Sequence, residues 1–97
     1  MQLEFHRAIA ADVSRIADYY EEAGGESLAS EFLTDLWSCF QKAADSPGAY
    51  APQEAGLRRV NLDRFPYHFL FRIVDDRVRI LVVRHHRRRP SWGRRRR

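Results

Sequence analysis

The sequence predicts an α+β domain in which a helical hairpin packs on one face of an antiparallel sheet. The first residues alternate between apolar and polar side chains, and the rest of the first half carries apolar side chains at helical spacing. Three strand-like runs separated by short turns fill the second half. The predicted order is therefore β-α-α-β-β-β, and 97 residues suffice for one hydrophobic core but not for two.

The opening strand and the first helix are indicated by a change in the spacing of apolar residues. Residues 2–6 alternate, with Leu3 and Phe5 on the same face, which is typical of a strand. After Ala8 the acidic residues, Asp12 among them, are expected on the solvent face of a helix. Its apolar stripe consists of Ile9, Val13, Ile16, Ala17 and Tyr20.

A second helix is predicted after the Gly24-Gly25 pair, which supplies a stop for the first helix. It begins near Glu26 or Ser27 and ends before Ser46-Pro47-Gly48. A join of two glycines between amphipathic helices favours an antiparallel hairpin. The expected inner stripe of the second helix is Ala29, Phe32, Leu33, Leu36, Phe40 and Ala43.

Three strands are predicted at 57–62, 67–74 and 78–85. Turn-forming residues separate them, so we expect an antiparallel meander with the second run in the centre and 57–62 at an edge. The helices leave the other face of the sheet open, and arginines at alternating strand positions should gather there. Residues 1–90 are expected to form the domain and 91–97 a basic, flexible C-terminal tail.

Charge is divided unevenly along the chain. Residues 1–55 contain three basic and ten acidic side chains, a balance of −7, whereas residues 56–97 contain fourteen and three, a balance of +11. All but one of the seventeen cations are arginines, whose planar fork binds phosphate and carboxylate groups. The composition therefore predicts an anionic partner for the C-terminal half.

The composition also limits the class of protein and the kinds of site. Cys39 is the only cysteine, which excludes an internal disulfide and a cysteine-cluster metal site. His85 and His86 have no Cys, Asp or Glu near them at ligand spacing, so we expect neither a metal nor a cofactor. No apolar run reaches the length of a signal or membrane segment, and we expect a cytoplasmic protein without membrane contact.

The candidate site residues lie in the basic half, with one exception. A ribonuclease needs proton-transferring groups and cations that stabilise the phosphorane, although a histidine at a strand end is more often structural. The catalytic candidates under that hypothesis are His85, Arg72, Arg84 and Glu54. The candidates for target binding are Arg84, Arg87, Arg88, Arg58 and Arg72.

Several segments, in this order and spacing, resemble the RelE/ParE toxin superfamily. The resemblance covers nearly the whole chain, and it implies the toxin of a bacterial type II toxin–antitoxin module that a small cognate antitoxin wraps around and neutralises. The segments are IADYY at 16–20, LRRV at 57–60, FPY at 65–67, FRI at 71–73 and ILVVRHHRRRP at 80–90.

Two mechanisms are implied by this resemblance. The tyrosine pair, the FPY segment and the His-x-Arg-Arg-x-Pro close are similar to the ParE and plasmid-stabilisation branch, whose members bind DNA gyrase. RelE-like members instead cleave mRNA on the ribosome without a metal, and this is the alternative; a non-toxic basic binding module is a second one. The expected partners are an acidic antitoxin, in a toxin–antitoxin hetero-oligomer, and either gyrase or the ribosome with mRNA.

Overall fold

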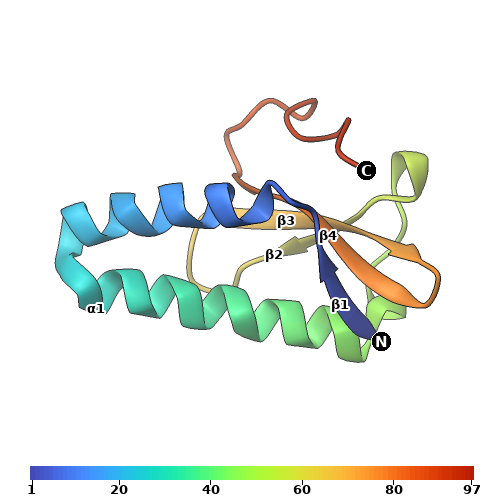
Figure 1. Ribbon diagram of the computed structural model, residues 1–97, viewed down its shortest axis with the longest axis horizontal. Helices are drawn as coiled ribbons and strands as arrows, with labels where there is room; N and C mark the ends of the chain where they lie inside the picture. Colours follow the sequence, from blue (N-terminus) through green and yellow to red (C-terminus); the bar gives the residue numbers. More distant parts are fainter.

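The computed structural model describes residues 1–97 and has one helical layer packed on a four-stranded sheet (Figure 1). Two short 3₁₀ turns, η1 and η2, lie in the connection between the helix and the meander. The element bounds are β1 Gln2–Phe5, α1 Ile9–Asp45, η1 Pro47–Ala49, η2 Glu54–Gly56, β2 Arg58–Asn61, β3 Tyr67–Val74 and β4 Arg77–His85. The predicted α+β class and the predicted order of elements are confirmed.

The helical segment α1 is folded into two arms that lie side by side in Figure 1. The reversal occurs at Gly25, where φ is 80° and the helical backbone is interrupted. A positive φ is readily adopted only by glycine, so the Gly24-Gly25 pair that predicted the stop also supplies the bend. The two arms form the expected helical hairpin.

The sheet has the strand order β1-β4-β3-β2. β2, β3 and β4 form the predicted antiparallel meander, with β2 at one edge. The expectation of a wholly antiparallel sheet was wrong, because β1 pairs in parallel with β4 and makes the sheet mixed. A parallel pair needs a long connection, and everything from α1 to β3 supplies it here.

The main core lies between the helical hairpin and the sheet. Phe32 on α1 and Phe69 and Phe71 on β3 have no exposed side-chain surface. Two positions in α1 differ from the prediction: Leu33 is 42% exposed, whereas Asp12 is only 1% exposed. Leu33 follows the buried Phe32 and faces solvent beside the inner stripe. Asp12 can be buried because Val83 and Arg96 donate hydrogen bonds to its carboxylate.

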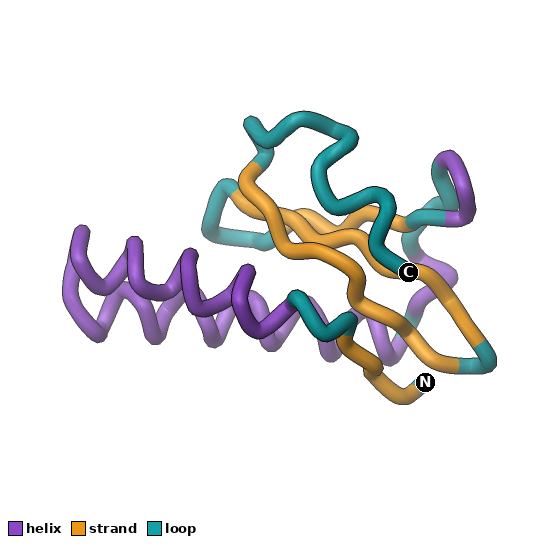
Figure 2. The backbone as a smooth tube through the Cα atoms, turned by 45° about the horizontal axis from the view of Figure 1, so that its top comes forward, coloured by secondary structure: helices purple, strands orange, loops and turns teal.

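A second, smaller core lies on the open face, which is the face of the sheet away from α1. It contains Leu57, Leu70, Leu81 and Val82, and Trp92 packs against it. Trp92 belongs to residues 86–97, here called the closing segment, which return over the strands as a loop (Figure 2). The basic C-terminal residues are thereby placed against the sheet.

Candidate functional site

Strand register brings basic side chains together on the open face. Arg72 on β3 lies directly opposite Arg79 on β4, and His68 lies opposite Arg84. Arg59 on β2 lies opposite Leu70, which belongs to the open-face core. The alternation of strand side chains therefore produces the basic surface that the sequence predicts.

Arg84 lies beneath the closing segment and not at the surface. Its side chain is only 6% exposed, and Nη1 donates to the carbonyl oxygens of Pro90 at 2.8 Å and Trp92 at 2.5 Å. Burial lowers the pKa of Arg84. In this conformation Arg84 anchors the closing segment, so the direct target contact predicted for it requires that segment to move.

His68 and His86 form a stacked pair that sequence reasoning did not identify. Their Nδ1 atoms are 2.9 Å apart, and the Nε of Arg84 donates to Nε2 of His68 at 2.9 Å. Because Nε2 of the neutral His68 ring accepts a hydrogen bond, Nδ1 carries the proton and donates a hydrogen bond to Nδ1 of His86. Both ring nitrogens of His68 are thus engaged.

The histidine pair is held in the neutral form by its surroundings. Burial lowers the pKa of His68 to about 3, and the charges of Arg59 and Arg84 act in the same direction. Desolvation and the nearby Arg59 charge also lower the pKa of His86. The two neutral imidazoles link Arg84 to Arg59 through hydrogen bonds, but they add no positive charge to the surface.

His85 and Arg87 are joined by a local contact at the end of β4. The backbone N–H of Arg87 donates to Nδ1 of His85 at 3.0 Å. The ring of His85 meets the ring of Tyr67 edge-on, with centroids 5.0 Å apart. This geometry fits the structural interpretation of a strand-end histidine.

Arg87 and Arg88 lie exposed at the start of the closing segment. The guanidinium of Arg88 lies over the Trp92 ring, 4.9 Å from its centroid. That ring orients Arg88 without neutralising it. These two residues are the members of the predicted target-binding set that reach solvent most directly.

Arg58 and Glu54 are placed apart from the histidines. Arg58 donates to the carbonyl oxygen of Tyr50 at 2.7 Å, and it thereby fastens the loop after α1. Glu54 is an exposed residue of η2 that forms an ion pair with Arg94 at 3.2 Å. Neither residue is brought to His85, so the four catalytic candidates do not form one cluster.

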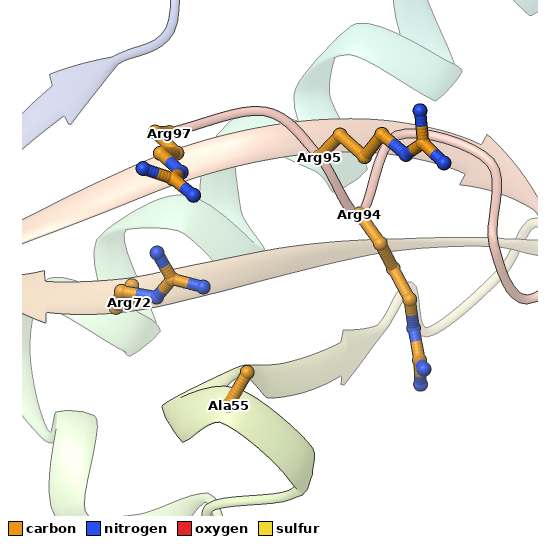
Figure 3. A pocket seen from close by; sticks show the side chains of 5 residues that line it. All are labelled: Ala55, Arg72, Arg94, Arg95 and Arg97. Atoms are coloured by element: carbon orange, nitrogen blue, oxygen red, sulfur yellow. The ribbon is translucent and has the colours of Figure 1, made fainter.

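A hollow of about 880 Å³ lies where β3, η2 and the closing segment meet. In Figure 3 the side chains of Arg72 on β3 and Arg97 of the closing segment point toward one another, whereas those of Arg94 and Arg95 extend away from Arg72. Ala55 is the only apolar side chain in the lining. The lining residues are Ala55, Arg72, Arg94, Arg95 and Arg97.

The closing segment is fixed by a buried acid that the sequence placed on the solvent face. Asp12 accepts two hydrogen bonds from the guanidinium of Arg96, at 2.6 and 3.2 Å. It also accepts the backbone N–H of Val83 at 3.1 Å. An acidic residue at an otherwise solvent-facing helix position gave no sequence signal for these partners.

The one group of potential metal ligands contains Cys39 with Asp35 and Asp63, whose ligand atoms lie within 4.8 Å of one another. The ammonium of Lys42 already pairs with Asp63 at 3.0 Å. Burial raises the pKa of Cys39 to about 11, and the nearby carboxylates add to this effect. The thiol of Cys39 is therefore protonated. Asp63 pairs with Lys42, and Asp35 accepts the backbone N–H of Arg64, so the three residues have structural partners without a metal.

Comparison with known proteins identifies the family. Residues 3–90 match the family model described as the ParE toxin of the type II toxin-antitoxin system, parDE. This chain belongs to the ParE toxin family. The relatives include Toxin ParE2 from two strains of Mycobacterium tuberculosis, CDC 1551 / Oshkosh and ATCC 25618 / H37Rv. Each is 24% identical over 90 residues, which cover 93% of this chain and 86% of the relative.

A solved structure also has the fold of this ParE family chain. It is described as the chromosomal ParDE TA system from P. aeruginosa, and it aligns with a TM-score of 0.79 at 27% sequence identity. The alignment covers 88% of this chain and 95% of the other. The predicted assignment to the ParE branch is therefore confirmed. None of the helical segments is long and apolar enough to cross a membrane.

Proposed function

We propose that this ParE family toxin arrests growth by binding DNA gyrase in the cytoplasm and that a cognate acidic antitoxin neutralises it. The family match supports the toxin part of the proposal directly. Residues 56–97 carry a net charge of +11, and an acidic antitoxin complements that charge.

The observation that favours gyrase binding over mRNA cleavage is the engagement of the histidines. His68 uses both ring nitrogens within the protein, and its pKa of about 3 keeps it neutral at physiological pH. His85 uses Nδ1 to accept a backbone hydrogen bond and packs on Tyr67, so only its Nε2 is free, and Glu54 pairs with Arg94 instead of lying beside it. A general acid or base needs a free nitrogen close to its substrate and a pKa near the working pH.

The exposed arginines after β4 provide a surface suited to binding. Arg88 is oriented by Trp92, and Arg87 has its backbone fixed through His85. Arginine is one of the residues that most often carry protein–protein binding energy. We therefore assign target contact to Arg87 and Arg88, with Arg84 holding the segment beneath them.

Induced expression of the toxin in bacterial cells tests the proposal. Gyrase binding predicts DNA breaks and filamentation while mRNA remains intact. Codon-phased cuts in mRNA would contradict the proposal and support the ribosome-dependent endonuclease. Growth without arrest, with the protein folded and abundant, would support the non-toxic binding module.

The antitoxin part of the proposal is tested by binding kinetics. Electrostatic steering predicts an association rate that falls steeply as salt rises, because the Debye length shortens. The measurement uses the toxin with the product of the adjacent reading frame. An association rate that does not change with salt would contradict a mainly electrostatic encounter.

A further inference from the structure

We propose that the hollow lined by Arg72, Arg94, Arg95 and Arg97 is a binding site for the phosphate backbone of duplex DNA. This inference goes beyond the proposed function, because it assigns a second partner that the toxin contacts directly and independently of gyrase. Three features of the hollow support it: four arginines line it, two of them have an Nε donor without a partner, and no acidic side chain lines it.

The hollow concentrates positive charge from two parts of the chain. Arg72 comes from β3, whereas the other three arginines come from the closing segment (Figure 3). Acidic side chains are absent from the lining, and Arg94 alone among the lining arginines forms an ion pair with one, Glu54, at 3.2 Å. A site with this balance attracts an anion and repels another cation.

The arginines of the lining have donors that an anion could satisfy. Arg72 faces Arg79 across β3 and β4, but Arg79 pairs with Glu4 at 2.7 Å, whereas Arg72 pairs with no acidic side chain. The Nε atoms of Arg72 and Arg94 are enclosed and have no hydrogen-bond partner. Enclosed donors without acceptors are uncommon in folded proteins. Phosphate oxygens in the hollow would neutralise the charges and give the guanidinium groups acceptors.

The lining favours a phosphate backbone over an acidic peptide. A peptide partner usually places a few well-packed side chains, often Trp or Tyr, in pockets that exclude water. Ala55 is the only apolar group here, so a peptide would find no anchor. Binding to nucleic-acid backbones, by contrast, rests mainly on cations and the release of counterions.

The same lining favours a duplex over a single strand. Proteins bind single strands by stacking bases on aromatic rings. Trp92 is the only Phe, Tyr or Trp in the closing segment, and it packs on the open-face core beneath Arg88 and Arg96. It therefore offers no stacking platform. A duplex presents regularly spaced phosphates without requiring one.

The test is a titration of a labelled duplex of arbitrary sequence, about 20 base pairs long, with the purified full-length toxin in increasing salt. The double variant Arg72→Gln/Arg95→Gln removes two of the lining cations. The logarithm of the affinity falls as the logarithm of the salt concentration rises. If each arginine contacts one phosphate, this slope should become less steep by about 1.8 in the double variant. The dissociation constant at low salt should rise about tenfold.

The matched control is Lys42→Gln/Arg64→Gln. It makes the same change in net charge, but both residues are exposed and pair with acids, Asp63 and Glu31, outside the hollow. Its slope should equal that of the wild type. The single variant Arg95→Gln should make the slope less steep by about 0.9. Because Arg95 is exposed, this variant should fold like the wild type.

Three results would overturn the proposal. The first is an equal loss of affinity in the control, which would mean that only total charge matters. The second is tighter binding to the single strand than to the duplex. The third is competition by a polyglutamate peptide at the same charge concentration as the duplex, which would assign the hollow to an acidic protein segment.

Discussion

Arg96 and Asp12, which are 84 residues apart in the sequence, form a two-point ion pair with distances of 2.6 and 3.2 Å. Asp12 is almost completely buried and also receives the backbone N–H of Val83. The pair joins the closing segment to the first helical arm and to β4. This ion pair, together with the hydrogen bonds from Arg84 to Pro90 and Trp92, holds the basic C-terminal residues against the sheet.

We expect Asp12→Ala to lower the free energy of unfolding by about 1–3 kcal/mol, because the Val83 N–H then has no acceptor inside the protein. Chemical denaturation measures the change. Asp18→Ala removes an exposed acid from the same helical arm and should change stability by less than about 0.5 kcal/mol. Equal effects in the two variants would contradict the buried role of Asp12.

The histidine pair predicts a specific acid sensitivity. His68 has an unfolded-state pKa near 6.5 and a folded-state pKa of about 3, so the unfolded state binds a proton first as the pH falls. The contribution of His68 to the free energy of unfolding should therefore be fully present above pH 6.5. It should decrease between about pH 6.5 and 3, with a limiting slope of about 1.4 kcal/mol per pH unit.

His68→Gln provides the comparison for this acid sensitivity. Relative to the wild type, the variant should lose less stability between pH 6.5 and 5, whatever its stability at neutral pH. Denaturation curves at several pH values give the difference. Parallel pH dependences in the two proteins would show that His68 does not titrate as described.

Two leucines in α1 distinguish the inner stripe from the outer face. Leu36 is 2% exposed and belongs to the main core, so Leu36→Ala should cost about 2–5 kcal/mol. Leu33→Ala, at a position that is 42% exposed, should cost far less. The melting temperatures of both variants check the assignment. A larger decrease in Leu33→Ala than in Leu36→Ala would show that the inner face of the helix has been assigned incorrectly.

Gly93 is needed where the closing segment approaches β4. Its φ is 82°, and a Cβ at this position would lie 2.6 Å from Cγ2 of Val82. Gly93→Ala should therefore displace the closing segment and accelerate tryptic cleavage after its arginines. Gly48→Ala has open space around it and should leave the cleavage rate unchanged. An unchanged rate in Gly93→Ala would contradict the packing of the segment.

Local patterns predicted the elements well because helix, strand and turn preferences act over a few residues. The bend at Gly25, the meander and the exposed arginines after β4 all follow from such patterns. The parallel pairing of β1 did not, because the direction of a long-range pair depends on how the intervening chain is packed.

The parts of the site that the sequence did not reveal are also long-range contacts. Asp12 resembles a solvent-facing acid until Arg96 and Val83 are placed beside it. Arg84 resembles an exposed strand-end cation until the closing segment covers it. No local pattern identifies these partners, since each contact joins segments that meet only in the folded protein.

The most direct test of gyrase binding compares Arg87→Ala/Arg88→Ala with His85→Ala. Purified variants are assayed for gyrase-dependent DNA cleavage and for ribosome-dependent mRNA cleavage. The account predicts that the arginine variant loses gyrase-dependent cleavage, because its charge-assisted contacts are removed, whereas His85→Ala retains most of it. Loss of mRNA cleavage by about 100-fold or more in His85→Ala, with gyrase unaffected by the wild-type toxin, would contradict it.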